Sequence, residues 1–210
     1  MIALVIGFLI LSLALHEYGH AWMAYKCGDD TAARMGRLTL NPIAHIDLYW
    51  TIILPLILYF ALGFAFGGAK PVPVVASNLR HPTRDMAFVA LAGPAMNILL
   101  AILFMLGLKV ALYVGDYEVS AILPQVLKLS VIINVALALF NMIPIPPLDG
   151  SRVLSYLLPS SLRQGYDQIE RFGMLIIVLL IWGGGLWPLI HGALADVVDL
   201  INWGTGGAWS

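Results

Sequence analysis

Charged side chains are scarce in this chain of 210 residues. Lysine and arginine together contribute 11 residues and aspartate and glutamate 12, so that 11% of the chain is charged and 60% is hydrophobic. A soluble domain carries about 25% charged residues. The mean hydropathy of +0.90 therefore predicts an integral membrane protein in a lipid bilayer. The net charge of −1 gives no basis for expecting a nucleic-acid partner.

Cysteine occurs only once, at Cys27. A single cysteine excludes an intramolecular disulfide and a cysteine-based zinc site. The first apolar run also lacks a basic n-region and a cleavage site of small residues, which argues against a removable signal peptide. The chain shows no internal repeat and no room for an appended soluble domain. We therefore expect one transmembrane domain over residues 1–210.

Long apolar runs are what the sequence does contain. About 20 apolar residues cross a bilayer as a helix. Five runs approach or exceed that length, which predicts an all-α polytopic membrane protein with about five transmembrane segments. The last run is broken by three glycines and a proline, and is predicted either as one long bent span or as a span plus an interfacial helix. The approximate bounds of the five runs are 2–25, 48–66, 86–114, 119–141 and 172–200.

Prolines interrupt this helical pattern in the segment 70–75. Pro71 and Pro73 stand at alternate positions, beside Val72 and Val74. Two prolines so placed exclude a regular helix and favour extended backbone. Three interpretations follow: a plain loop between spans, a short edge strand, or a re-entrant segment whose unpaired backbone groups face a cavity.

The N-terminal run contains the pattern HEYGH, formed by His16, Glu17 and His20 with two intervening residues. Residues four apart share one face of a helix, so both imidazoles can reach one ion with the glutamate beside them. This is the HExxH pattern of zinc hydrolases. The alternative is a histidine pair that faces polar groups in a helix bundle. Ionisable residues are costly inside a bilayer, which favours the functional interpretation.

A catalytic zinc usually takes three protein ligands, so a third one is needed. Asp149 is the leading candidate because it follows residues 144–147, where three prolines in four positions must unwind the fourth run into a broken helix. Its carboxylate could then lie at membrane depth. The competing interpretation is that Asp149 caps a helix that starts at Gly150. The other candidates are Asp47, Asp85, Glu118, His45, His81 and His191.

Three motifs occur in a fixed order: HEYGH, AGPAMN at 92–97 and NMIPIPPLDG at 141–150. Together they resemble the site-2 protease family of intramembrane zinc metalloproteases. The stretches 41–47 and 70–74 are similar to the compact prokaryotic branch of that family. The chain departs from relatives that carry a PDZ domain, a CBS domain or an extra N-terminal span, which leaves substrate selection open.

The resemblance implies roles for three further residues. It makes Asp149 the third ligand of one zinc ion per chain, lets Asn141 help to position substrate, and links Asn97 to the active-site region. Glu17 would take a proton from the water that zinc activates and pass it to the leaving amine. The amide of Asn141 or Asn97 could donate to the developing oxyanion.

The expected substrate is a transmembrane protein or peptide, cleaved within or near its membrane segment. Because a helical peptide bond is shielded, the substrate must unwind, and the extended backbone at Pro71, Val72, Pro73 and Val74 could pair with it as an added strand. The expected location is a prokaryotic inner membrane. The alternatives are a membrane metal transporter and an inactive homologue that only binds helices; a di-iron oxidase would need more histidines than the five present.

Basic residues give a weak indication of orientation. If every run crosses the membrane, two sets of lysines and arginines lie on opposite sides. The positive-inside rule then slightly favours the first set as cytoplasmic. The first set is Lys70, Arg80, Arg84, Arg152, Arg163 and Arg171, and the second is Lys26, Arg34, Arg37, Lys109 and Lys128.

Overall fold

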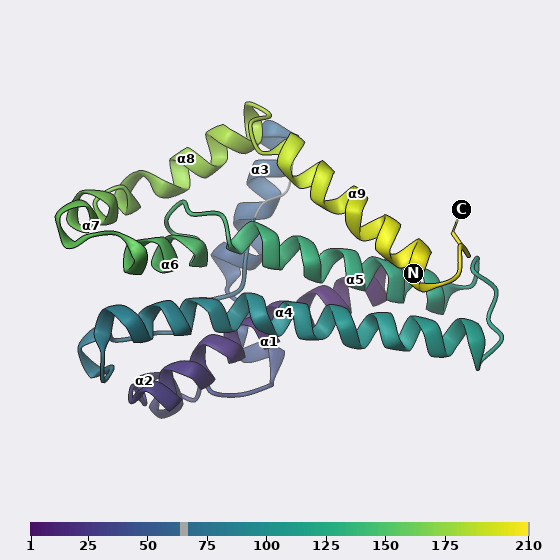
Figure 1. Cartoon of the computed structure of the whole chain (residues 1–210), viewed down its shortest axis with the longest axis horizontal. Coiled ribbons are helices and arrows are strands. Elements are labelled where there is room, and N and C mark those ends of the chain that lie inside the picture. The colour runs from purple at the N-terminus through teal and green to yellow at the C-terminus, as the bar shows by residue number, and fades with distance from the viewer. Residues whose placement is uncertain (64–66, 210) are drawn as a thin grey trace.

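The computed structural model describes residues 1–63 and 67–209, and over these ranges the chain is helical and contains no strand (Figure 1). Short 3-10 turns occur at Pro42–His45 and Ala76–Asn78. The α-helices are α1 (Ile2–Cys27), α2 (Thr31–Arg34), α3 (Leu54–Leu62), α4 (Pro82–Tyr113), α5 (Ile122–Asn141), α6 (Asp149–Leu157), α7 (Ser160–Asp167), α8 (Glu170–Trp182) and α9 (Trp187–Gly204).

Three of these helices, α1, α4 and α5, are long and apolar enough to cross a membrane. They lie along the long axis of the molecule, with α4 and α5 as an antiparallel pair and α1 behind them (Figure 1). The all-α membrane class predicted from the sequence is confirmed, with three candidate spans. The prediction of five spans is not confirmed, because the second and last runs do not form single long helices.

The second apolar run begins with a π-helical stretch, Leu48–Ile53, and continues as the nine residues of α3. Asp47 caps this start, since its side chain accepts hydrogen bonds from the N–H groups of Tyr49 and Trp50. Pro55 stands in the first turn of α3, where a missing N–H costs nothing. The predicted end of this run, at residue 66, lies outside the described residues.

The last run divides into two helices. A turn that contains Gly184, with φ of 77°, separates α8 from α9. From this turn α9 descends across α5 towards the end of the molecule where the N-terminus also lies (Figure 1). Ile201 of α9 is 1% exposed and packs in one cluster with Leu108 of α4 and Val131 of α5. The C-terminal helix is thus joined to the α4–α5 pair.

Small residues allow α1 to approach α4 closely. Ala14, Ala21 and Ala24 of α1 are buried, and a Cβ atom added at Gly19 would lie 2.7 Å from the carbonyl oxygen of Ala92. Helices in membranes associate through such small surfaces because lipid offers little hydrophobic driving force. The close approach occurs within the HEYGH motif and brings α4 against its histidines.

The interrupted regions take irregular paths. α5 ends at Asn141, and the chain passes through turns to the start of α6 at Asp149. Residues 67–75 form neither helix nor strand, and their end at Val75 is extended, with φ of −103° and ψ of 105°. Whether this segment is re-entrant in a membrane stays a prediction. α4 continues through Pro94 without ending.

Basic residues gather at one end of the molecule, which corrects the two opposed sets assumed above. The backbone N–H of Arg80 donates to the carbonyl of Cys27, and the side chain of Arg37 donates to the carbonyl of Lys70, so the region after α1 and the region before α4 are adjacent. α2, α7 and the start of α4 share this end in Figure 1. Only Lys109 and Lys128 belong to the opposite end.

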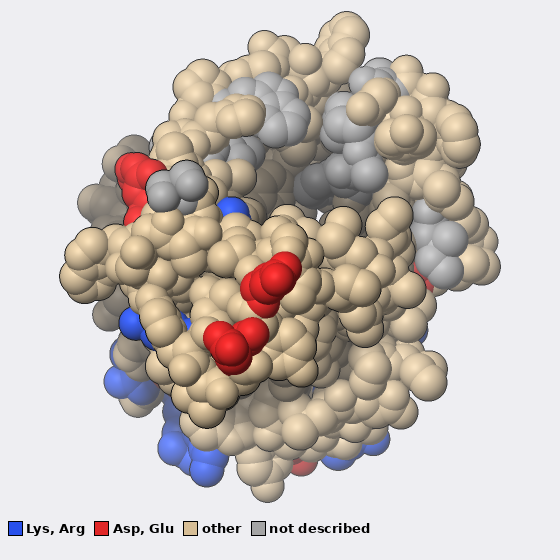
Figure 2. Space-filling view, turned by 90° about the vertical axis from the view of Figure 1, so that its right-hand side faces the viewer, with Lys and Arg blue, Asp and Glu red and all other residues tan. Residues whose placement is uncertain are grey.

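The reason for the error is that the second run does not carry the chain across to the other end. The basic end, defined here as the end with α2 and α7, therefore holds Lys26, Arg34, Arg37, Lys70, Arg80, Arg84, Arg152, Arg163 and Arg171. Figure 2 looks at the opposite end, where two groups of acidic atoms lie near the centre of the face and most blue atoms lie towards its left and lower margins. Asp116 and Glu118 belong to the connection at this end.

Candidate metal centre

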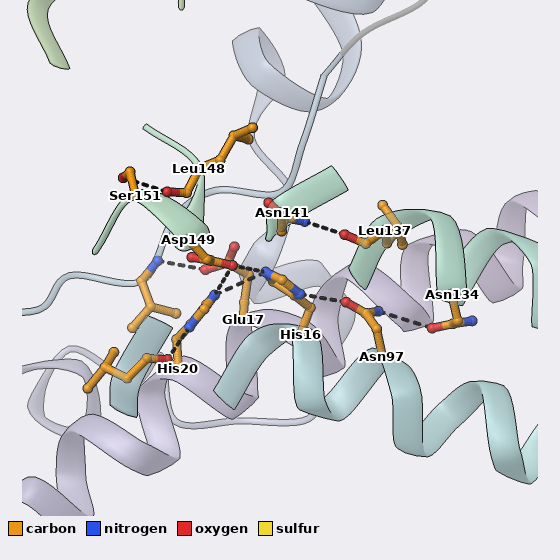
Figure 3. A network of polar contacts seen from close by, with 12 residues as sticks. His16, Glu17, His20, Asn97, Asn134, Leu137, Asn141, Leu148, Asp149 and Ser151 are labelled. Atoms are coloured by element: carbon orange, nitrogen blue, oxygen red, sulfur yellow. Dashed lines mark hydrogen bonds and ion pairs between the residues drawn. The ribbon is translucent and has the colours of Figure 1, made fainter. Parts of the chain in front are cut away.

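Three side chains from distant parts of the sequence meet in the candidate centre (Figure 3). The Nε2 atoms of His16 and His20 on α1 lie 3.0 Å apart. The Oδ2 atom of Asp149, at the start of α6, is 3.3 Å from the first and 3.4 Å from the second. Glu17 lies beside the two histidines. One potential ligand atom from each of His16, Glu17 and His20 lies within 4.8 Å of the other two.

This triangle has the dimensions of a zinc site. Zinc binds histidine nitrogen and carboxylate oxygen at about 2.0–2.2 Å with tetrahedral angles, which places ligand atoms about 3.3 Å from one another. The three observed separations, 3.0 to 3.4 Å, match that value. Oδ2 of Asp149 is moreover a buried oxygen without a hydrogen-bond donor. The donor set and the partnerless oxygen both fit a bound zinc ion.

The residue after Asp149 lets the chain turn back towards the histidines. A Cβ atom added at Gly150 would collide with the carbonyl group of Met142. Glycine at this position lets the chain fold back tightly enough to present Asp149 to α1.

The far side of each imidazole is held by a hydrogen-bond partner on α4. Nδ1 of His16 is 2.6 Å from Oδ1 of Asn97, and Nδ1 of His20 is 2.7 Å from the carbonyl oxygen of Val89. A histidine that binds metal through Nε2 usually donates its Nδ1–H in this way, which fixes the orientation of the ring. Asn97 is fully buried, and Asn134 of α5 accepts a hydrogen bond from its amide.

Glu17 makes one contact that the sequence did not indicate. Its Oε2 atom accepts a hydrogen bond of 2.8 Å from the backbone N–H of Val72. This contact joins the catalytic candidate to the centre of the segment 67–75. The segment predicted to bind substrate therefore lies directly at the HEYGH motif, where its backbone orients the glutamate carboxylate.

Further hydrogen bonds hold residues 70–75. At Lys70, the N–H donates to the carbonyl of His45 (2.8 Å). At the other end, Val75 donates its N–H to Asp29 (2.7 Å). Asp29 is fully buried and also accepts from the backbone and hydroxyl of Thr31 and from the amide of Asn78. Residues 70–75 are thus held by hydrogen bonds at both ends and at Val72.

Asn141 lies at the end of α5, near His16 and Asp149 in Figure 3. Its Nδ2 group donates to the carbonyl of Leu137, one turn earlier in the same helix, at 2.9 Å. Among the described residues, nothing else bonds the second hydrogen of that NH2 group or its carbonyl oxygen. Asn97 differs, because both ends of its amide are engaged within the protein interior.

Comparison with known proteins decides between the enzyme and its alternatives. The family model described as Peptidase family M50 matches residues 3–119 and 108–183. The chain belongs to peptidase family M50. This family membership confirms the resemblance to site-2 proteases drawn from the three motifs, and it identifies the chain as a zinc metalloprotease rather than a transporter.

Two relatives are similar in sequence to this M50 peptidase over most of its length. YwhC of Bacillus subtilis, named as a zinc metalloprotease, is 36% identical over 202 residues, covering 92% of this chain and 89% of its own length. Rip2 of Mycolicibacterium smegmatis, also named as a zinc metalloprotease, is 32% identical over 85% of this chain and 66% of its own length. No solved structure matches this chain.

The candidate site contains groups that sequence reasoning missed. Val89 contributes a backbone carbonyl, which leaves no signal in a sequence. Asn134 is a polar residue inside an apolar run, and such residues are functional candidates in membrane helices, so that signal was present. His45 is buried, lies outside the metal triangle and has Nε2 2.9 Å from the carbonyl of Thr39.

Proposed function

We propose that this M50 enzyme is an intramembrane protease, which hydrolyses peptide bonds within or near transmembrane segments of substrate proteins, and that His16, His20 and Asp149 bind its one zinc ion. The observation that carries the proposal is the metal triangle, whose two histidines belong to α1, a helix apolar enough to span a membrane. The expected setting is a prokaryotic inner membrane, where the enzyme would take part in regulated proteolysis.

Zinc in this site supplies a Lewis acid that lowers the pKa of bound water toward about 7 and polarises a carbonyl group. Glu17 is placed to take the proton released when water adds to the scissile carbonyl, and to return it to the leaving amine. The N–H of Val72 holds the carboxylate in the required orientation. Asn141 is the proposed donor to the oxyanion, since part of its amide is free.

The segment 70–75 is the proposed docking site for an unwound substrate. Of its four backbone N–H groups, those of Lys70, Val72 and Val75 already donate to the protein. Among the described residues, none donates to the carbonyl groups at 71–74. A substrate strand would thus bind here chiefly by donating its own N–H groups to these carbonyls.

Two substitutions test the proposal in detergent or liposomes. Glu17→Gln should keep about one zinc per chain and lose cleavage of a transmembrane peptide, because the amide cannot accept the proton. Asp149→Ala should lose zinc or bind it at least about 10-fold more weakly. The measurements are zinc content, zinc affinity and peptide cleavage.

The outcomes separate the two parts of the proposal. Full cleavage by Glu17→Gln would remove the assigned base, whereas undiminished zinc affinity of Asp149→Ala would remove the third ligand. Cleavage only of soluble peptides, with transmembrane peptides untouched under the same conditions, would contradict the intramembrane activity while leaving the metal site intact.

A further inference from the structure

A chain of buried polar side chains leads away from the metal triangle through three helices. Figure 3 shows its first part, from His16 through Asn97 to Asn134. Its members are Asn97 on α4, Asn134 on α5 and Ser12 on α1, one turn before His16. Asn97 and Asn134 are 0% exposed and Ser12 is 1% exposed. Buried amides in a membrane protein are costly unless every group is satisfied, so the direction of each hydrogen bond is constrained.

Two backbone carbonyls fix the direction at the far end of the chain. Nδ2 of Asn134 lies 2.9 Å from the carbonyl oxygen of Ser130 and 2.9 Å from Oγ of Ser12. The Ser12 hydroxyl in turn donates to the carbonyl of Phe8 at 2.7 Å. A carbonyl can only accept, and a hydroxyl that donates there accepts from its other neighbour. Asn134 must therefore present its NH2 group to this end.

This orientation passes to His16 in two steps. Asn134 presents its Oδ1 atom to Nδ2 of Asn97 at 3.0 Å, which requires Asn97 to present its own Oδ1 atom to His16. Nδ1 of His16 must then carry the hydrogen and donate. Nε2 is left with its lone pair, the form that binds a metal.

The two metal-site histidines differ in how firmly the partner of Nδ1 fixes the tautomer. His20 donates to the carbonyl of Val89, which is an acceptor in any arrangement. The partner of His16 is a side-chain amide, whose oxygen and nitrogen are nearly equal in size and can exchange by rotation. A reversed Asn97 would place NH2 against Nδ1 of His16 and would favour the tautomer with hydrogen on Nε2. Only a second contact can prevent this reversal.

We infer that Asn134 is a positioning residue for the metal centre, which acts through Asn97 to hold His16 in its metal-binding tautomer. The inference rests on the proposed zinc site. Asn134 touches neither the metal triangle nor a substrate, so its effect reaches the centre through two hydrogen bonds. It also joins α5 to α1 and α4 through the polar groups of the site itself.

The test compares zinc affinity of the full-length protein in detergent, measured by competition with a chromogenic chelator. Asn134→Leu removes the acceptor that orients Asn97 and should weaken zinc binding by about 10- to 100-fold. Asn134→Asp, in the protonated form that burial favours, keeps its carbonyl oxygen towards Asn97 and a hydroxyl donor towards Ser130 or Ser12, and should bind zinc more tightly than Asn134→Leu. Adding Asn134→Leu to Asn97→Ala should cause no further loss, because the first residue acts through the second.

Controls separate positioning from stability. Thr205→Val removes a buried hydroxyl at the end of α9 that makes no contact in this chain of hydrogen bonds, and should leave zinc affinity unchanged. The ¹⁵N shifts of the His16 ring in zinc-free protein should show hydrogen on Nδ1 in the parent and a mixture of tautomers in Asn134→Leu. If Asn134→Leu does not fold, the same measurements on Asn134→Asp and Asn97→Ala decide.

The inference is overturned if Asn134→Leu binds zinc as the parent does, or if its effect adds fully to that of Asn97→Ala. Asp149→Ala serves as the reference for the metal site. Lost zinc affinity in Asp149→Ala with normal affinity in Asn134→Leu overturns the inference alone. Normal affinity in Asp149→Ala overturns the proposed site on which it rests.

Discussion

Gly93 lets the backbone of α4 lie directly against the two histidine rings. A Cβ atom at this position would clash with Cε1 and Nε2 of His20 and would lie 2.7 Å from Cε1 of His16. The rings cannot retreat, because both are fixed at Nδ1 by partners on the same helix. The glycine of the AGPAMN motif is thus a requirement of the metal triangle.

We expect Gly93→Ala to weaken zinc binding at least about 10-fold, since displaced ligands lose the geometry of the site. Gly107→Ala is the matched control on α4, because a Cβ there would make only ordinary contact with Leu127 at 3.7 Å. Chelator competition on both variants checks the prediction. Equal zinc affinity in the two variants would show that the rings can shift without losing the ion.

Asp29 supports the segment 70–75 through its charge. Burial opposes ionisation, but hydrogen bonds from Thr31, Asn78 and Val75 outweigh it, so the pKa of Asp29 lies below its ordinary value of 3.8. Because the pKa is lower in the folded state, the stabilisation is complete above pH 3.8 and is lost as the pH falls through the lower, folded-state pKa.

Asp29→Asn should therefore destabilise the protein at pH 7 by about 1–3 kcal/mol, because an NH2 group would face donors. The difference from the parent should shrink as the pH falls below 3.8. Thermal unfolding of both proteins across pH provides the measurement. Asp30→Asn is the control: its partner Arg34 is mostly exposed, and the variant should change stability by less than about 1 kcal/mol. If the stability difference between Asp29→Asn and the parent did not change with pH, the charge of Asp29 would not be the source of the stabilisation.

At the scale of elements, the hydrogen bond between Val72 and Glu17 can be removed without changing the backbone conformation of the segment 70–75. Val72→Pro deletes the N–H that orients Glu17, while extended backbone remains compatible with proline. We expect zinc affinity to stay unchanged and cleavage to fall by at least about 10-fold. Val74→Pro is the control, because the N–H of Val74 donates to none of the described residues. Equal loss in both variants would assign the effect to backbone shape.

The sequence predicted the elements around the site better than their extents. Apolar runs showed where α1, α4 and α5 lie, since long helices follow directly from hydropathy. The alternate prolines indicated that helix would be absent at 70–75. The division of the last run into α8 and α9 was left open, because a glycine-rich turn permits either a bend or a break.

The metal triangle was predictable for a similar reason. HExxH spacing places two ligands on one helix face, and Asp149 followed from the family resemblance. Contacts made by backbone groups, such as Val89 to His20 and Val72 to Glu17, were not predictable. Any residue offers a carbonyl or an N–H, so the sequence carries no mark of which one is used.

At the scale of the whole molecule, the gathering of basic residues predicts the orientation in the membrane. The basic end holds all but two of the 11 lysines and arginines, and the positive-inside rule places it in the cytoplasm. His20 lies seven residues before the end of α1 at that side, which corresponds to about 10 Å of helix. Cleavage is therefore expected in the cytoplasmic half of the bilayer.

Cysteine labelling tests this orientation, because Cys27 is the only native cysteine. In a Cys27→Ser background, Arg34→Cys should react with a membrane-impermeant maleimide only in inside-out vesicles. Asp116→Cys, at the other end of the molecule, should react only from the periplasmic face. The reverse pattern would place the metal centre in the outer half of the bilayer.

The carbonyl-rich segment 70–75 also bears on how copies of this protein behave towards one another. Exposed strand edges usually invite pairing with an identical edge, because each carries both donors and acceptors. Here Pro71 and Pro73 lack N–H groups, and most of the remaining N–H groups are already used inside the molecule. If two such edges came together, the carbonyl groups of one would face the carbonyl groups of the other, and few hydrogen bonds could form. The proposed docking edge is therefore not self-complementary, and crowded copies of the protein are not expected to join through it.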